Sequence, residues 1–173
     1  MTYPGSAAYE TAQVAYYAQQ QIDLEPACRV GPKTAADVAA ILKAAVDNKI
    51  PFAVHSGGHL TMIGGSNIAD EGFSIDLGAL NNFKIAKDEK SVTFGTGLRW
   101  GQIFPPLAEK GLTAVGGRDP GVGVGGYLAG GKLMSFVMRV QFSRMSIFFQ
   151  VVSPSCPISM AWEATMSLST RWP

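Results

Sequence analysis

Two histidines flank a pair of glycines in the stretch PFAVHSGGHL, residues 51–60, and the chain has no others. Imidazoles bind metal ions, move protons and form covalent bonds. His55 and His59 have a spacing that brings two metal ligands together on a helix. Gly57-Gly58 lies between them and disfavours a helix. No metal site is therefore expected, and two alternatives remain: a loop with incidental histidines, or a loop that holds and attaches a cofactor.

A second glycine-rich stretch, GGRDPGVGVGG at 116–126, also follows a predicted strand. Glycine lets backbone N–H groups turn inward and lets a phosphate approach without a Cβ in the way. Two such loops favour a site for the diphosphate of a long cofactor.

The spacing of Gly121, Gly123 and Gly126 matches the G-x-G-x-x-G fingerprint of dinucleotide-binding folds. That fingerprint requires an acidic residue about twenty positions later, and none occurs between Tyr127 and Trp162. An NAD(P)-binding dehydrogenase fragment, or a non-catalytic binding fragment, is therefore kept as the alternative.

The elements around these loops predict an α+β fold with a βαβ start and a mostly antiparallel later sheet. Residues 27–54 are interpreted as strand, helix and strand, and Thr34 with Asp37 predicts a capping box at the helix start. The remaining predicted elements are a helix over 7–21, strands over 73–77, 82–86 and 91–96, a helix over 99–110 with Pro105-Pro106 disturbing its middle, and a strand over 112–115.

Composition gives little support for a nucleic-acid or membrane partner, because the net charge is +1. The apolar run 133–152 carries Arg139 and Arg144, each costing about 2.5–3.5 kcal/mol at a bilayer centre, so a spanning helix is not expected. Residues 1–21 have no basic start and no long apolar run, so a secretory signal is not expected there.

Three stretches, 25–65, 72–85 and 92–117, resemble the FAD-binding domain of FAD-linked oxidases. These are the berberine-bridge-enzyme-like and 6-hydroxynicotine-oxidase-like flavoproteins of the vanillyl-alcohol oxidase superfamily. The resemblance is closest to fungal members and covers residues 9–131. Its features, in the family's order, are Pro-Ala-Cys, Ser-Gly-Gly-His, Ile-Asp-Leu, Gly-x-x-Trp and Val-Gly-x-Gly-Gly. It implies a helical lead-in over 1–22 and a partial PCMH-type FAD-binding domain over 23–131.

The resemblance also implies FAD as the cofactor and assigns the site. The loop that wraps the diphosphate is His55, Ser56, Gly57 and Gly58. His59 is the candidate for a covalent bond to the 8α-methyl carbon of the flavin. Further cofactor contacts are expected from Gly117, Val122, Gly123, Gly125 and Gly126. Many relatives have a second link through a cysteine, but Asp119 stands at that position, so one link at most is expected.

The implied activity is an oxidase reaction, with hydride passing from substrate to flavin N5 and dioxygen leaving as hydrogen peroxide. The substrate is a small molecule whose class stays open. No residue is assigned as the catalytic base, because the candidate carboxylates belong to the cofactor-binding half: Asp70, Glu71, Asp76 and Asp119.

Residues 132–173 do not resemble the family, and they hold five of the seven methionines and one acidic residue, Glu163. A poorly ordered tail is expected there. Codons for Gly131-Lys132 can contain a typical intron start, so a retained intron is one origin for it. The expected protein is a truncated fragment that binds FAD weakly and does not turn over substrate, from a family whose members are often secreted.

Overall fold

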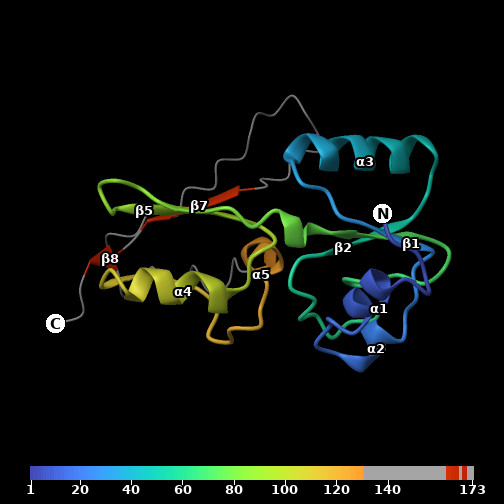
Figure 1. Cartoon of the computed structure of the whole chain (residues 1–173), viewed down its shortest axis with the longest axis horizontal. Helices are drawn as coiled ribbons and strands as arrows, with labels where there is room; N and C mark the ends of the chain where they lie inside the picture. Colours follow the sequence, from blue (N-terminus) through green and yellow to red (C-terminus); the bar gives the residue numbers. More distant parts are fainter. Residues whose placement is uncertain (131–162, 168, 171–173) are drawn as a thin grey trace. The chain divides into compact units, whose positions relative to one another are not determined.

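The computed structural model describes residues 1–130, 163–167 and 169–170 (Figure 1). These residues divide into an N-terminal unit, Met1–Leu80, and a C-terminal unit, Asn81–Pro173. Each unit contains one of the two glycine-rich loops. The mixture of helices and strands is the α+β class predicted from the sequence.

The N-terminal unit is built on a parallel sheet of three strands, β1 (Cys28–Val30), β2 (Phe52–His55) and β3 (Phe73–Asp76). Their order is β1-β3-β2, and both outer strands pair with β3 in parallel. The strand, helix and strand predicted over 27–54 are present, and β1 and β2 are parallel with β3 between them. The strand predicted over 73–77 therefore belongs to this parallel sheet and not to an antiparallel one.

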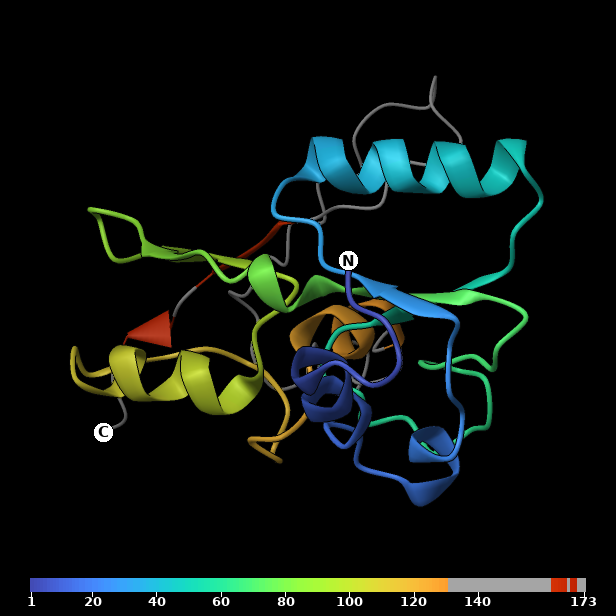
Figure 2. The same cartoon turned by 45° about the vertical axis from the view of Figure 1, so that its right-hand side comes forward.

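Helix α3 (Ala35–Asp47) connects β1 to β2 and buries Val38, Leu42 and Ala45. The capping box is confirmed: the Asp37 N–H donates to Thr34 Oγ1 at 3.1 Å, and the Thr34 N–H donates to Asp37 Oδ2 at 2.9 Å. Both views show α3 on one side of the strands and the short N-terminal helices on the other (Figures 1 and 2).

The predicted helix over 7–21 is interrupted. Helix α1 (Ala7–Gln13) ends before Tyr16, and α2 (Gln19–Ile22) begins after Tyr17. Between them, the Tyr17 N–H donates to the Gly58 carbonyl at 2.9 Å, so a tertiary hydrogen bond replaces a helical one. Contacts with the rest of the unit override the local helix propensity here.

The C-terminal unit contains an antiparallel sheet in the order β4 (Phe83–Ile85), β5 (Ser91–Gly95) and β7 (Glu163–Ser167). A second pair consists of β6 (Leu112–Thr113) and β8 (Ser169–Thr170). β7 and β8 belong to the tail that was expected to be poorly ordered, and the remainder of that tail, with residues 133–152, lies outside the described residues.

Helix α4 (Trp100–Ala108) continues through Pro105-Pro106, so the expected disturbance is wrong. Its inward residues Trp100, Ile103 and Leu107 are completely buried, and this burial stabilises the helix despite two missing N–H donors. Helix α5 (Val124–Gly130) follows the second glycine loop. None of the helices in the described part of the chain is long and apolar enough to cross a bilayer.

Candidate functional site: the loop after β2

The loop Ser56–His59 begins where strand β2 ends, and its shape depends on glycine. Gly58 has a φ of +63°, in the left-handed region that favours glycine. A Cβ at this position would lie 2.6 Å from Nε2 of His55 and 3.1 Å from Cδ1 of Tyr16. The contact with His55 is closer than Cβ contacts normally are, and the one with Tyr16 is tight, so conformation and space both favour glycine at position 58.

Two backbone donors of this loop have no acceptor in the part of the chain that the structure describes. Gly57 and Gly58 are both buried, and neither N–H donates to any described residue. The Gly58 carbonyl, in contrast, accepts the Tyr17 N–H. Buried N–H groups are nearly always hydrogen-bonded. Adjacent backbone N–H groups that converge in a loop are typical of anion-binding sites.

His55, at the end of β2, is 95% buried. Its Nδ1 lies 3.4 Å from Oδ1 of Asp76, the residue opposite it on β3. Among the described residues, Nε2 of His55 has no hydrogen-bond partner.

Burial raises the pKa of the Asp76 carboxyl, but contact with the His55 imidazole and the Gly78 N–H lowers it by more. The positive charge of Arg29 acts in the same direction, and the pKa is held below its ordinary range. Asp76 is therefore a carboxylate at neutral pH.

Arg29 of β1 is 97% buried and has no carboxylate within 4 Å among the described residues. Its guanidinium donates to Tyr16 Oη at 2.8 Å and to Asn67 Oδ1 at 3.4 Å, and also to Gln13 Oε1. The cation lies over the rings of Tyr9 and Tyr16, 5.1 and 5.4 Å from the centroids. Neutral acceptors and aromatic faces therefore compensate this buried charge.

The rings of the two histidines contact two adjacent tyrosines. Tyr16 lies against His55, with ring centroids 4.6 Å apart and planes inclined at 53°. Tyr17 stacks on His59, with centroids 4.1 Å apart and planes inclined at 13°. Sequence analysis missed Tyr16, Tyr17 and Arg29. The adjacent aromatic pair in a helix-like polar stretch was the one available signal.

The second glycine loop, in the C-terminal unit, is shaped by Trp100. A Cβ on Gly116 or Gly117 would lie 2.4 or 2.5 Å from the indole. Trp100 is fully buried and is also packed against the rings of Phe104 and Tyr127, so it cannot move aside. Gly117, predicted as a cofactor contact, is therefore required for packing.

Backbone groups farther along this loop are bonded within the chain. The Val122 N–H donates to the Asp119 carbonyl at 3.3 Å, and the Val122 carbonyl accepts from Trp100 at 3.1 Å. The Gly121 N–H donates to Asp119 Oδ1 at 2.7 Å, which makes Asp119 the residue that closes the turn.

The remaining predicted contacts differ in their surroundings. Gly123 is buried, Gly125 is partly buried, and a Cβ on Gly126 would meet nothing within 4 Å. The described residues contain no group of three His, Cys, Asp or Glu that could hold a metal.

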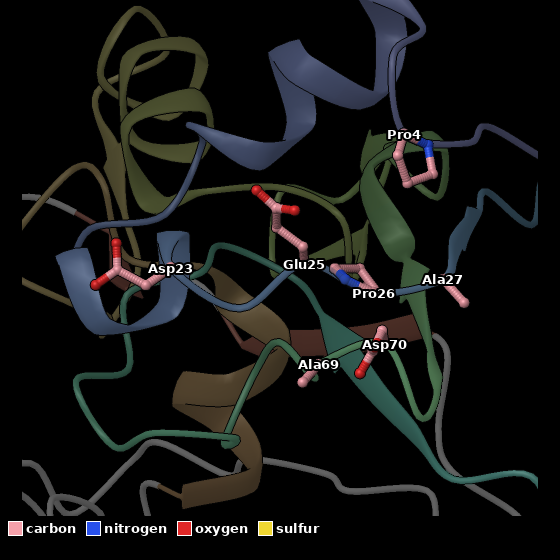
Figure 3. A pocket seen from close by; sticks show the side chains of 7 residues that line it. All are labelled: Pro4, Asp23, Glu25, Pro26, Ala27, Ala69 and Asp70. Carbon is pink, nitrogen blue, oxygen red and sulfur yellow. The ribbon is translucent and has the colours of Figure 1, made fainter.

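An open depression of about 300 Å³ lies elsewhere on the N-terminal unit (Figure 3). Figure 3 labels its lining as Pro4, Asp23, Glu25, Pro26, Ala27, Ala69 and Asp70. Three carboxylates repel a diphosphate, so this depression does not suit the anionic part of a dinucleotide.

Comparison with known proteins gives one consistent result. A family model described as "FAD binding domain" matches residues 26–154, which continues past residue 131, where the resemblance in the sequence ended. The FAD-dependent monooxygenase tpcD of Cochliobolus heterostrophus is 38% identical over 134 residues, covering 78% of this chain and 26% of that protein. FAD-dependent monooxygenase sdcF of Emericella nidulans is 34% identical over 149 residues, covering 85% of this chain and 31% of that protein.

Solved structures agree with the sequence matches. The structure of 6-hydroxy-D-nicotine oxidase from Arthrobacter nicotinovorans is 29% identical, with a TM-score of 0.62, over 72% of this chain and 26% of that chain. Wild-type BBE-like 1 of Physcomitrella patens is 27% identical, with a TM-score of 0.58, over 73% of this chain and 27% of that chain. The chain thus spans about a quarter of the length of the first relatives it matches. By its sequence and its fold, the chain belongs to the FAD binding domain family, with the PCMH-type domain that berberine-bridge-enzyme-like flavoproteins share.

Proposed function

We propose that this chain is the cofactor-binding part of an FAD-dependent oxidoreductase, in which the loop Ser56–His59 binds the diphosphate of FAD and His59 attaches the flavin. One observation carries the proposal. The buried N–H groups of Gly57 and Gly58 have no acceptor among the described residues, and they lie beside the only histidines of a chain in an FAD-binding family.

The residues present fit a diphosphate. Phosphate oxygens accept hydrogen bonds from backbone N–H groups, and the absence of a Cβ at Gly57 and Gly58 lets them come close. The Nε2 atom of His55 is buried without a partner among the described residues. An imidazole nitrogen that carries a proton can donate a hydrogen bond to an anion.

His59 would supply the nucleophile for attachment. Its imidazole nitrogen would lose a proton and bond to the 8α-methyl carbon of the flavin in place of one hydrogen. Dioxygen would take up the two electrons and two protons released and leave as hydrogen peroxide. Asp119 cannot form the second, thioether link, because a carboxylate has no sulfur.

When bound, FAD supplies a two-electron acceptor that takes hydride from a substrate and passes the electrons to dioxygen. Oxidase activity releases both oxygen atoms as hydrogen peroxide. The names of the fungal relatives favour a second candidate, monooxygenase activity, which inserts one oxygen atom into the substrate and needs an added reductant.

The cofactor assignment is tested with the purified 173-residue chain, grown with riboflavin, denatured and digested. We expect flavin absorbance that stays with the peptide bearing His59, and its loss from the peptide in His59→Ala. If the wild-type chain binds FAD but this peptide carries no flavin, the covalent attachment is refuted and the proposed FAD binding stands. A chain that binds no FAD at all would refute both.

A further inference from the structure

The two adjacent tyrosines between α1 and α2 contact the two histidines of the loop after β2. The buried Tyr16 lies against His55, and the exposed Tyr17 stacks on His59. One two-residue segment thus contacts both ends of the Ser-Gly-Gly sequence. The α1–α2 segment and the β2 loop also share a backbone hydrogen bond, from Tyr17 N–H to the Gly58 carbonyl.

The segment that contains Tyr16 and Tyr17 is held in place by Arg29 of the parallel sheet. Arg29 on β1 donates to Tyr16 Oη at 2.8 Å and lies over the Tyr16 ring. A buried side chain with both contacts has little freedom to turn. Because Tyr17 follows Tyr16 directly and its own N–H is bonded to Gly58, the start of the Tyr17 side chain is also fixed.

The stacked ring of Tyr17 determines the plane of the His59 imidazole. With the planes inclined at 13° and the centroids 4.1 Å apart, rotation of the imidazole about its Cβ–Cγ bond would drive it into the phenol ring. The lone pair of an imidazole nitrogen lies in the ring plane. A partner on the ring face therefore restricts the orientation of the nucleophile without covering it.

We propose that Tyr17 is a positioning residue that orients His59 for attachment of the flavin, with Tyr16 and Arg29 holding Tyr17 in place. The inference rests on the proposed attachment at His59. Tyr17 is 66% exposed, so its ring adds little to the core, and removing it tests orientation more than stability.

The stack itself is tested without FAD, by NMR of the imidazole protons. Ring current from Tyr17 should shift the His59 signals upfield in the wild-type chain and in Tyr17→Phe. In Tyr17→Ala the upfield shift of the His59 signals should be lost, while the chemical shifts of the His55 signals should not change. Tyr3→Ala is the matched control, because Tyr3 is also exposed and its hydroxyl donates to Met1 Sδ. His59 signals that do not respond to Tyr17→Ala would overturn the inference.

The role is tested by the rate at which apo-protein attaches added FAD, followed by mass spectrometry. We expect Tyr17→Ala and Tyr17→Leu to attach flavin about ten- to hundredfold more slowly, as a misoriented nucleophile does, with Tyr17→Phe and Tyr3→Ala near wild type. Non-covalent FAD affinity should change less than about twofold, since the diphosphate donors remain.

Attachment by Tyr17→Ala at the wild-type rate would overturn the positioning role. A wild-type chain that never attaches flavin would instead overturn the proposed function, whatever the NMR result.

Discussion

The two glycine loops look alike in sequence, but they differ in what their glycines do. In the loop after β2, Gly57 and Gly58 have N–H groups without acceptors in the described part of the chain. In the loop after β6, Gly116 and Gly117 lie against the buried indole of Trp100, and the backbone at Val122 is bonded on both sides. Glycine can be required by a ligand or by a neighbouring side chain, and the free backbone donors distinguish the two cases.

Gly117→Ala should have the largest effect on stability. Its Cβ would lie 2.5 Å from Cδ1 of Trp100, whose ring is fully buried and cannot yield. We expect urea unfolding of the chain to show a loss of about 3 kcal/mol. Gly126→Ala is the control, because its Cβ has open space and lies in α5, where alanine is favoured by about 0.5–1 kcal/mol. Equal stabilities for the two variants would contradict the packing role of Gly117.

Gly58→Ala should separate binding from stability in the other loop. The left-handed φ costs an alanine about 1–2 kcal/mol, and the Cβ would push against His55. Losing aligned donors to an anion should weaken FAD binding about ten- to hundredfold in a fluorescence titration. Gly130→Ala is the control, because its Cβ would meet nothing within 4 Å and Gly130 is not among the expected cofactor contacts, so it should bind FAD as the wild type does. FAD binding by Gly58→Ala that is as tight as that of Gly130→Ala would contradict the assignment of this loop to the diphosphate.

Asp119→Ala should have a smaller effect, because it removes one acceptor from a turn. Loss of the bond from Gly121 N–H to Oδ1 should cost about 0.5–1.5 kcal/mol in unfolding free energy. Asp119→Asn keeps an acceptor oxygen and should lose less unfolding free energy than Asp119→Ala. Flavin attachment at His59 should be the same in both variants. A drop in attachment as large as the one in His59→Ala would mean that the turn takes part in the cofactor site.

The smallest effect is a dependence of stability on acid. Because the folded-state pKa of Asp76 lies below its ordinary value of 3.8, the carboxylate stabilises the fold above that value. The contribution is lost as the pH falls through the folded-state pKa. The free energy of unfolding in urea should fall less between pH 6 and pH 3 for Asp76→Asn than for the wild type. Asp70→Asn, a change at an exposed carboxylate, is the control. An identical pH dependence in Asp76→Asn and the wild type would contradict the stabilising role.

Local signals in the sequence predicted local structure well. Thr34 and Asp37 form the capping box because its hydrogen bonds join residues three apart. The strands β3, β4 and β5 lie within the ranges that composition and alternation predicted. Ser56–His59 was identified as a loop because paired glycines end a strand.

Non-local contacts were the part that the sequence could not predict. Nothing in β1 or β2 indicates that β3 will lie between them, because strand order depends on pairing across distant segments. The helix over 7–21 breaks because Arg29 and Gly58 bond to Tyr16 and Tyr17. The packing of Gly117 against Trp100 could not be predicted either, because the burial of Trp100 has no local signature in the sequence.

The most direct test of the difference between the loops is an amide NMR titration of the chain with FAD. Binding of the diphosphate should shift the Gly57 and Gly58 N–H signals more than those of Gly116, Gly117 and Gly121 and slow their hydrogen exchange. FAD binding that leaves the Gly57 and Gly58 amides unchanged would contradict the proposed diphosphate site.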